Sequence, residues 1–390
     1  MLATAVLGGL LAALMHNAES LLPAVALHIL IDLRSLLLTP PVKYRRAPDA
    51  APPPYRGAVS APALVSILVV TYDHADEIDA CLGGALAQAV GDLEVEVVVA
   101  DNASHDDGAD RVRARAAADP RVTLVQMGAN TGFAAAVNAA FAAAHGDHVL
   151  ILNPDCVMDP GCARALRDRL LTDPAVGLAA ALLRDPDGTP QLFARRDLRL
   201  RGALLGFTSI GRRLDRRRGG AALALRRYED LWASGPPREP VTVFCPAAAC
   251  IMAAREDLRP APLDERFPLF FNDGDLCHRL ARAGRRAEVV PAATATHGYG
   301  TSVARAQSAD PARMRAEWVA SMRRYAQRWW PRPARAALAV ALLADAVAGA
   351  ALCLVRREDP REVRGTLGGL GLPGGPAPLL TPVARRGGRR

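Results

Sequence analysis

The chain has 390 residues, of which 51% are hydrophobic and 23% are charged, so it can bury a large core and is not disordered throughout. Basic residues outnumber acidic ones by 48 to 40, but Lys43 is the only lysine, and such a compositional bias is weak support for a nucleic acid partner. Seven cysteines without a Cys-x-x-Cys pair argue against a zinc site and indicate free thiols in a reducing compartment.

The N-terminal residues 1–38 are strongly apolar, and we interpret them as a membrane-associated helical segment. They would form a hairpin or long span in the bilayer, or a helix lying in its interface. A secretory signal is an alternative, but no positive charge precedes the apolar run. Lys43 and two arginines follow it and favour the cytoplasmic side of the membrane. Residues 39–63 are rich in proline and form a linker.

Short apolar runs alternate with helical stretches from residue 64 onward. We expect strands at 65–71, 95–100, 122–126, 149–152, 177–183, 241–244, 248–254 and 287–290, and helices at 75–89, 111–118, 132–144, 160–172 and 272–283. Gly284 would end the last of these helices, because glycine readily adopts the left-handed backbone found there. Alternation at this spacing predicts an α/β fold with a mostly parallel sheet and right-handed crossovers.

Two segments outside this alternation have their own composition. Arginines crowd into residues 195–238, which form either a solvated loop or a basic surface for an anionic acceptor. After a long helix at 311–330, residues 331–358 are apolar except for a few charges that include Asp345. A carboxylate at the centre of a span costs roughly 2.5–3.5 kcal/mol, so we predict an interfacial amphipathic helix. Residues 359–390 are rich in Gly, Pro and Arg and predict a disordered tail.

Polar clusters follow the expected strands or begin the expected helices. The four are Thr71-Tyr72-Asp73, Asp101-Asn102-Ala103-Ser104, Asn153-Pro154-Asp155 and Asn272-Asp273-Gly274-Asp275. Polar residues at the carboxyl ends of strands lie where open α/β sheets bind ligands. Each cluster taken alone also fits an ordinary turn, since Asn, Pro and Asp all favour turns.

The order of these clusters, between residue 65 and about 300, resembles the family 2 glycosyltransferases, which are inverting enzymes with the Rossmann-like GT-A fold. The rhamnosyltransferase-like branch is the most similar. The resemblance is carried by Val70-Thr71-Tyr72, Asp101-Asn102-Ala103-Ser104, Asn130-x-Gly132-Phe133 with Asn138, Leu152-Asn153-Pro154-Asp155, and Phe270-Phe271-x-Asp273-x-Asp275-Leu276-Cys277 with Arg279. One such match is weak, but five in register form a strong pattern. It makes residues 64–330 the glycosyltransferase domain.

The resemblance implies a divalent metal, Mn²⁺ or Mg²⁺, that neutralises charge on a nucleotide-sugar diphosphate. Asp155 would bind it, since hard cations prefer oxygen ligands. His297 matches a position that supplies an imidazole ligand in related enzymes, although a structural histidine is an alternative. Related enzymes usually carry two aspartates one residue apart, and here Asn153 replaces the first, so we count it among the donor-binding residues.

Further donor contacts follow from the same resemblance. Asp101 would accept hydrogen bonds from the nucleoside, with a simple Asx turn as the alternative. Thr71 and Tyr72 would pack beside the base. Asn130 and Gly132 lie in a turn where glycine lets the backbone approach the donor closely.

Asp273 matches the general base that deprotonates the acceptor hydroxyl, with a helix N-cap as the alternative role. The family usually shows Glu-Asp here, whereas this chain has Asn272-Asp273. Asp275 would instead pair with Arg279 one helical turn away.

Together these features predict an inverting, membrane-associated hexosyltransferase at the cytoplasmic face of the cell membrane. It would take a nucleotide-sugar donor, with L-rhamnose as the suggested sugar, and a lipid-linked or polysaccharide acceptor. A processive synthase is an alternative, but Tyr325 stands where that class has glutamine before its Arg-Trp pair. A sugar-nucleotide pyrophosphorylase would need a glycine-rich basic loop at residues 72–74, which is absent. A non-catalytic binding protein on a decayed transferase is the third alternative.

Overall fold

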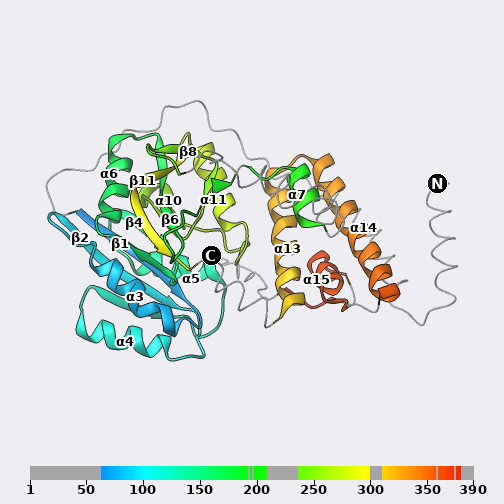
Figure 1. Cartoon of the computed structure of the whole chain (residues 1–390), viewed down its shortest axis with the longest axis horizontal. Coiled ribbons are helices and arrows are strands. Elements are labelled where there is room, and N and C mark those ends of the chain that lie inside the picture. Colours follow the sequence, from blue (N-terminus) through cyan, green and yellow to red (C-terminus); the bar gives the residue numbers. More distant parts are fainter. Residues whose placement is uncertain are drawn as a thin grey trace, which may run out of the picture. The chain divides into compact units, whose positions relative to one another are not determined.

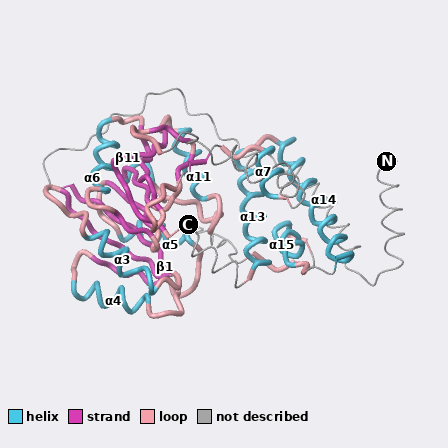
Figure 2. The backbone as a smooth tube through the Cα atoms, in the orientation of Figure 1, coloured by secondary structure: helices cyan, strands magenta, loops and turns pink. Residues whose placement is uncertain are grey.

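The computed structural model describes residues 63–191, 194–195, 197–208, 236–298, 310–356, 359–372 and 375–378. The predicted apolar segment 1–38, almost all of the linker 39–63 and most of the Arg-rich stretch lie outside the described residues. The described chain divides into two compact units. We call residues 63–199 and 236–298 the sheet unit, and residues 200–208 and 310–378 the helical unit. Figure 2 shows that described strands occur only in the sheet unit.

Nine strands of the sheet unit form one sheet in the part of the chain that the structure describes. They are β1 (Ala63–Thr71), β2 (Leu93–Asp101), β3 (Val122–Gln126), β4 (His148–Leu152), β5 (Cys156–Met158), β6 (Val176–Arg184), β8 (Val241–Val243), β10 (Cys250–Ala254) and β11 (Arg286–His297). The strand order is β3-β2-β1-β4-β10-β6-β11-β5, with β8 paired to β11. Figure 1 labels β1, β2, β4, β6, β8 and β11 of this sheet. Strands β1 to β4 are parallel, and β10 runs antiparallel between β4 and β6. Because β11 is parallel to β6, both run in the direction of β1.

Helices cover both faces of this sheet. On one face lie α3 (Ala75–Leu86), α4 (Gly108–Ala118) and α6 (Cys162–Thr172), and on the other lie α5 (Phe133–Ala143), α10 (Arg255–Leu258) and α11 (Asn272–Arg282). Strand β1 shows why two layers are needed, because Ile67 and Val69 pack into the first core while Leu68 and Val70 pack into the second. A strand that is apolar on both sides is stable only between two layers.

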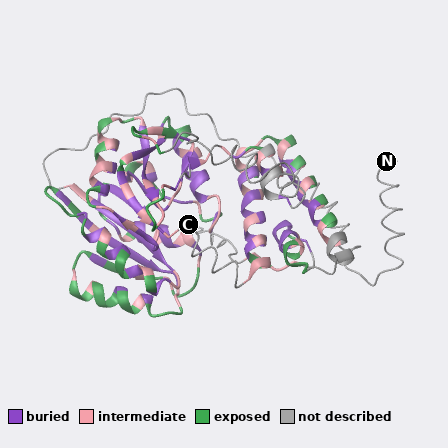
Figure 3. Cartoon of the chain, viewed as in Figure 1, coloured by how far each residue is buried: buried purple, intermediate pink, exposed green. Residues whose placement is uncertain are grey.

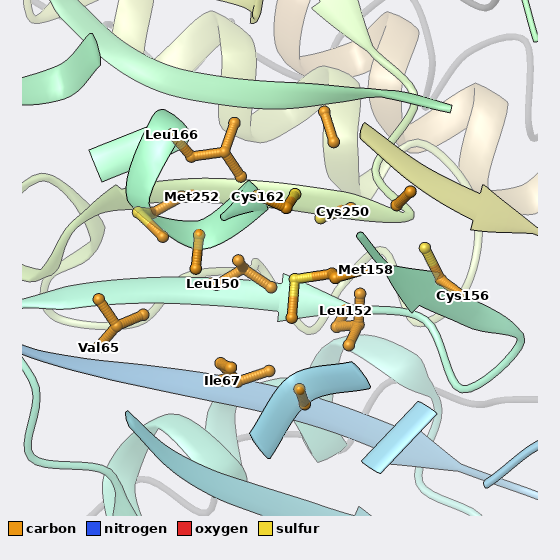
Figure 4. Close-up of a cluster of buried hydrophobic side chains, with 14 of the residues drawn as sticks. Val65, Ile67, Leu150, Leu152, Cys156, Met158, Cys162, Leu166, Cys250 and Met252 are labelled. Atoms are coloured by element: carbon orange, nitrogen blue, oxygen red, sulfur yellow. The ribbon is translucent and has the colours of Figure 1, made fainter. Parts of the chain in front are cut away.

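Buried cysteines and methionines fill part of the first core. Figure 4 shows Cys156, Cys162 and Cys250 beside Met158 and Met252, between strands and α6. Cys81, Cys156, Cys162, Cys245, Cys250 and Cys277 are buried free thiols. Burial raises the pKa of the Cys81 thiol, so it stays protonated and packs as a small apolar group.

The helical unit consists of α7 (Leu200–Phe207), α13 (Pro311–Trp329), α14 (Arg332–Arg356) and α15 (Arg361–Leu370). Helix α15 contradicts part of our prediction, because residues 359–390 were expected to form a disordered tail. Its Gly365 and Gly369 lie against α13, where an added Cβ would stand 2.5 Å from the carbonyl oxygens of Ala312 and Ala316 respectively. The glycines that suggested disorder instead let two helices pack closely. Residues 379–390 lie outside the described residues.

Most predicted elements of the sheet unit agree with the structure to within a few residues. Strand β11 is the main exception, since it continues to His297 instead of ending at Val290. Short strands β5, β7 (Ala194–Arg195) and β9 (Cys245–Pro246) were not predicted. The extension of β11 and the pairing of β7 with β9 both bring residues into the site described next.

Candidate active site

The predicted site residues lie at one edge of the sheet. Strands β1, β2, β4 and β11 run in the same direction, so Thr71, Asp101, Asn153 and His297 all fall at or just beyond carboxyl ends. Helix α11 leads back to the amino end of β11, so its own first residues, including Asp273, face the same edge. Open α/β sheets bind their ligands at this edge.

Thr71 and Asp101 are paired in register on adjacent strands, and both are buried. Asp101 accepts a hydrogen bond from the Ser104 backbone N–H at 3.3 Å, three residues on, whereas an Asx turn would bond to the residue two positions on. The next residues have unusual backbones, with φ of 58° at Asp73 and 65° at Ala103. Non-glycine residues in this region are strained and concentrate at functional sites. Tyr72 is partly exposed, and its ring meets that of His105 edge to face.

Asn102 links this strand end to the turn before α5. Its side-chain amide donates to Asn130 Oδ1 at 2.9 Å, and its Oδ1 accepts from the Thr131 backbone N–H at 2.9 Å. Gly132 follows with φ of 91°, a conformation that side chains disfavour. The donor-binding candidates on β2 and in the turn therefore belong to one hydrogen-bonded group. Asn102 was recognised as part of a motif but not as a site residue, although it makes the connection.

Asn138, on α5, ties the turn region to the loop that precedes α11. Its Nδ2 donates to the Leu263 carbonyl at 2.9 Å, and its Oδ1 accepts from the Leu263 N–H at 3.1 Å. The Ala134 N–H, in the first turn of α5, donates to the Pro268 carbonyl of the same loop. These bonds explain a motif asparagine as a support for the loop that leads to Asp273.

Asp155 and His297 meet across the edge of the sheet. The His297 Nε2 lies 3.4 Å from Asp155 Oδ1, and both side chains are buried. On its other side, His297 Nδ1 lies 2.9 Å from Gln191 Oε1. The Gln191 Nε2 donates to the His297 carbonyl at 2.8 Å and to Asp185 Oδ1 at 2.6 Å. Because both of those oxygens are acceptors, the amide orientation is fixed, and His297 Nδ1 must be the donor to Gln191.

This arrangement suits a divalent metal. With Nδ1 donating to Gln191, His297 has only Nε2 left for a metal, and this atom faces Asp155, so a cation between these groups would satisfy both. Two ligands about 2.1 Å from one ion stand roughly 3.0–3.4 Å apart, which agrees with the observed 3.4 Å. No group of three His, Cys, Asp or Glu side chains that could hold a metal occurs among the described residues. Asp155 and His297 would thus leave coordination positions for the donor diphosphate and water.

Asp273 lies in the first turn of α11, but it does not cap the helix. The N-cap is Phe271, whose φ is 66°, so the alternative role foreseen for Asp273 is wrong. Asp273 Oδ1 accepts from the Gly274 N–H at 2.7 Å, and Oδ2 accepts from Arg195 Nη1 at 2.8 Å. As expected, Asp275 is buried and paired with Arg279, at 3.3 Å.

The sequence did not reveal the contact of Gln191 with His297 or the contact of Arg195 with Asp273. Gln191 lies in the loop after β6 and Arg195 in the two-residue strand β7, and each is far along the chain from its partner, His297 or Asp273. Arg195 had been noted only as one of many arginines. No periodicity or motif spacing signals such pairings.

Comparison with known proteins shows which family this part of the chain resembles. Residues 66–228 match the family model described as "Glycosyl transferase family 2". Residues 66–228 are thus similar to the family 2 glycosyltransferases. The match includes Asp101 and Asp155, while Asp273 and His297 lie beyond its end. With the mainly parallel sheet, it confirms the expected α/β fold of the GT-A type.

Curated proteins and solved structures are also similar to this chain. The chain is 27% identical over 318 residues to the N-acetylglucosaminyl-diphospho-decaprenol L-rhamnosyltransferase of Mycobacterium tuberculosis, covering 77% of this chain and 98% of that protein. It is 36% identical over 105 residues to the succinoglycan biosynthesis protein ExoO of Rhizobium meliloti, covering 27% and 29% of the two chains. The solved structure of mannosyltransferase PcManGT from Pyrobaculum calidifontis, in complex with GDP-Man and Mn²⁺, has 21% identity, coverage of 88% and 93%, and a TM-score of 0.45.

Proposed function

We propose that this glycosyltransferase transfers L-rhamnose from its thymidine diphosphate to a lipid-linked or polysaccharide acceptor, with inversion and with Mn²⁺ or Mg²⁺. The relative, which is named as an L-rhamnosyltransferase for a diphospho-decaprenol acceptor, supports the choice of the sugar and of a lipid-linked acceptor. The observation that carries the proposal is the common edge shared by Asp101, Asp155 and Asp273. Asp101 is available to bind the nucleoside, Asp155 to bind the metal, and Asp273 to deprotonate the acceptor hydroxyl.

The donor would lie along the ends of β1, β2 and β4. Asp101 can accept hydrogen bonds from the base or the ribose, with Thr71 and Tyr72 beside the base. The backbone at Gly132 can approach the donor without a side chain in the way. Phe133, Phe270 and Phe271 offer apolar surface for the methyl group of a 6-deoxy sugar. Such a pocket rejects one added hydroxyl by roughly a hundredfold.

Asp273 would act as the general base. The acceptor hydroxyl oxygen attacks the anomeric carbon from the face opposite the diphosphate, the bond from that carbon to the diphosphate oxygen breaks, and the hydroxyl proton passes to Asp273. A positioned carboxylate typically contributes ~10²–10⁴-fold to such a step. A cation held by Asp155 and His297 would offset the negative charge that develops on the departing diphosphate.

Helix α14 supports association with a membrane. Residues 332–350 are the one stretch among the described residues that is long and apolar enough to cross a bilayer, and 33% of it is buried. Its charged Asp345 and Arg335 are buried, with Asp345 3.9 Å from Arg315. The exposed positions inside the helix form an apolar stripe, which consists of Ala337, Val340, Ala344, Val347 and Ala348 (Figure 3). Such a face is expected to lie in the lipid interface at the cytoplasmic side.

Donor turnover with a membrane extract as acceptor source tests the proposal. Thymidine-diphosphate rhamnose, UDP-hexoses and GDP-mannose would be offered separately, with Mn²⁺, with Mg²⁺ and with excess chelator. We expect rhamnose to enter the lipid fraction only when metal is present. Preference for another donor would refute the sugar assignment alone. Extended polymer as the product would favour a processive synthase, and no turnover of any donor would favour a binding protein.

A further inference from the structure

Arg195 contacts the candidate base directly. It lies at the end of β7, whose pairing with β9 holds the backbone beside the start of α11. The guanidinium donates to Asp273 Oδ2 at 2.8 Å, and the side chains are 35% and 10% exposed respectively. The carboxylate is thus nearly buried, while the arginine still reaches solvent.

Both oxygens of the Asp273 carboxylate carry hydrogen bonds in this arrangement. Oδ1 accepts from the Gly274 N–H and Oδ2 from Arg195. A carboxylate that accepts a proton must direct an oxygen at the reacting hydroxyl, and a charge-assisted bond from arginine competes with that hydroxyl. Burial strengthens the competition, because charges interact more strongly away from water. Each oxygen keeps a second lone pair, but the guanidinium fixes the orientation of the carboxylate and occupies one side of Oδ2 until something draws it away.

An anionic acceptor can draw the Arg195 guanidinium away from Asp273. We propose that Arg195 is a positioning residue that binds a phosphate group of the acceptor and thereby frees Asp273 Oδ2 for the acceptor hydroxyl. Arginine pairs with phosphate oxygens through two parallel N–H donors, so a diphosphate next to the acceptor sugar competes well with one carboxylate oxygen. This inference rests on the proposed function and adds to it the requirement that the acceptor carry a phosphate close to the reacting sugar.

The arrangement also protects the donor when no acceptor is present. Water can attack the anomeric carbon in place of the acceptor. The bond to the diphosphate would then break, Asp273 would take a proton from the water, and free sugar and nucleotide diphosphate would be released. While Arg195 holds Asp273, that wasteful step lacks its base. Removal of Arg195 is therefore expected to raise hydrolysis of the donor, whereas a purely structural role predicts no such rise.

The test uses the full chain with Arg195→Gln and Arg195→Lys. Arg164→Gln is the matched control, because Arg164 is 36% exposed and pairs with Asp92 at 2.7 Å, near the amino end of β2 and away from the site. Two readouts are needed. One is nucleotide diphosphate released without acceptor, and the other is transfer to two acceptors that carry the same sugar, one on a polyprenyl diphosphate and one on a neutral alkyl chain.

We expect the unmodified protein to prefer the diphosphate acceptor. Arg195→Gln should reduce that preference at least tenfold, mainly through KM, and raise acceptor-independent hydrolysis several-fold, while Arg195→Lys retains part of the preference. Equal losses with both acceptors and no rise in hydrolysis would overturn the inference and leave the proposed function standing. An unmodified protein that neither transfers sugar nor hydrolyses the donor would refute the proposed function, and the inference with it.

Discussion

The hydrogen bonds of Gln191 set the chemistry of His297. Its amide is held by the His297 carbonyl and Asp185, so its oxygen faces His297 Nδ1. A glutamine in that orientation keeps the imidazole proton on the side away from Asp155. The histidine then offers a lone pair where a metal ligand is needed, as outer-shell partners do at many metal sites. A direct structural contact between His297 and Asp155, without a metal, is the competing interpretation.

Asp155→Asn separates these interpretations at the level of a single residue. The amide keeps the size of the side chain but is a much poorer ligand for a hard cation. Titration calorimetry should show that Mn²⁺ raises the affinity of the unmodified protein for thymidine diphosphate. In the variant, this increase in affinity should be at least tenfold smaller. Asp110→Asn, at an exposed position on α4, is the control. An equal Mn²⁺ effect in the variant and the unmodified protein would rule out Asp155 as a ligand.

Helix α14 shows how the sequence of an element and its packing have to be considered together. Asp345 argued against a membrane span, and the structure explains why that charge is tolerated, since it pairs with Arg315 of α13 inside the helical unit. Arg335 donates to the Gln327 carbonyl at 3.4 Å and is also buried. The outward stripe is left without charge. Trp329 ends α13 and Trp330 follows it, just before α14; both are only partly buried, and tryptophan is enriched at membrane interfaces.

The double substitution Val340→Asp and Val347→Asp tests the membrane role of this element. Both valines are exposed, at 54% and 57%, so the change should leave the fold intact while it places two charges in the apolar stripe. In flotation with phosphatidylglycerol vesicles, the ratio of vesicle-bound to free protein should fall at least tenfold. Val90→Asp is the matched control, because Val90 is 59% exposed in the sheet unit. Unchanged flotation of the double variant would remove α14 from the contact surface.

At the scale of the whole molecule, the sheet unit was largely predictable and the helical unit less so. Apolar runs that end in polar residues indicated β1, β2 and β4 and placed Asp101 and Asp155 at strand ends, because direction and register follow from local pattern. The extension of β11 to His297 was not predictable, since it depends on pairing with β5. Helix α15 was missed because composition alone cannot distinguish glycines that pack against a neighbour from glycines of a flexible tail.

The central claim is that Asp273 is the base of a glycosyl transfer, and Asp273→Asn tests it most directly. Asparagine keeps the size of the side chain and an oxygen for the Gly274 N–H, so the fold and donor binding should persist. The measurement is the transfer rate at saturating donor and metal, with thymidine-diphosphate binding followed in parallel. We predict a fall in turnover of at least a hundredfold with donor affinity within about threefold of the unmodified protein. Near-normal turnover by the variant would contradict the account.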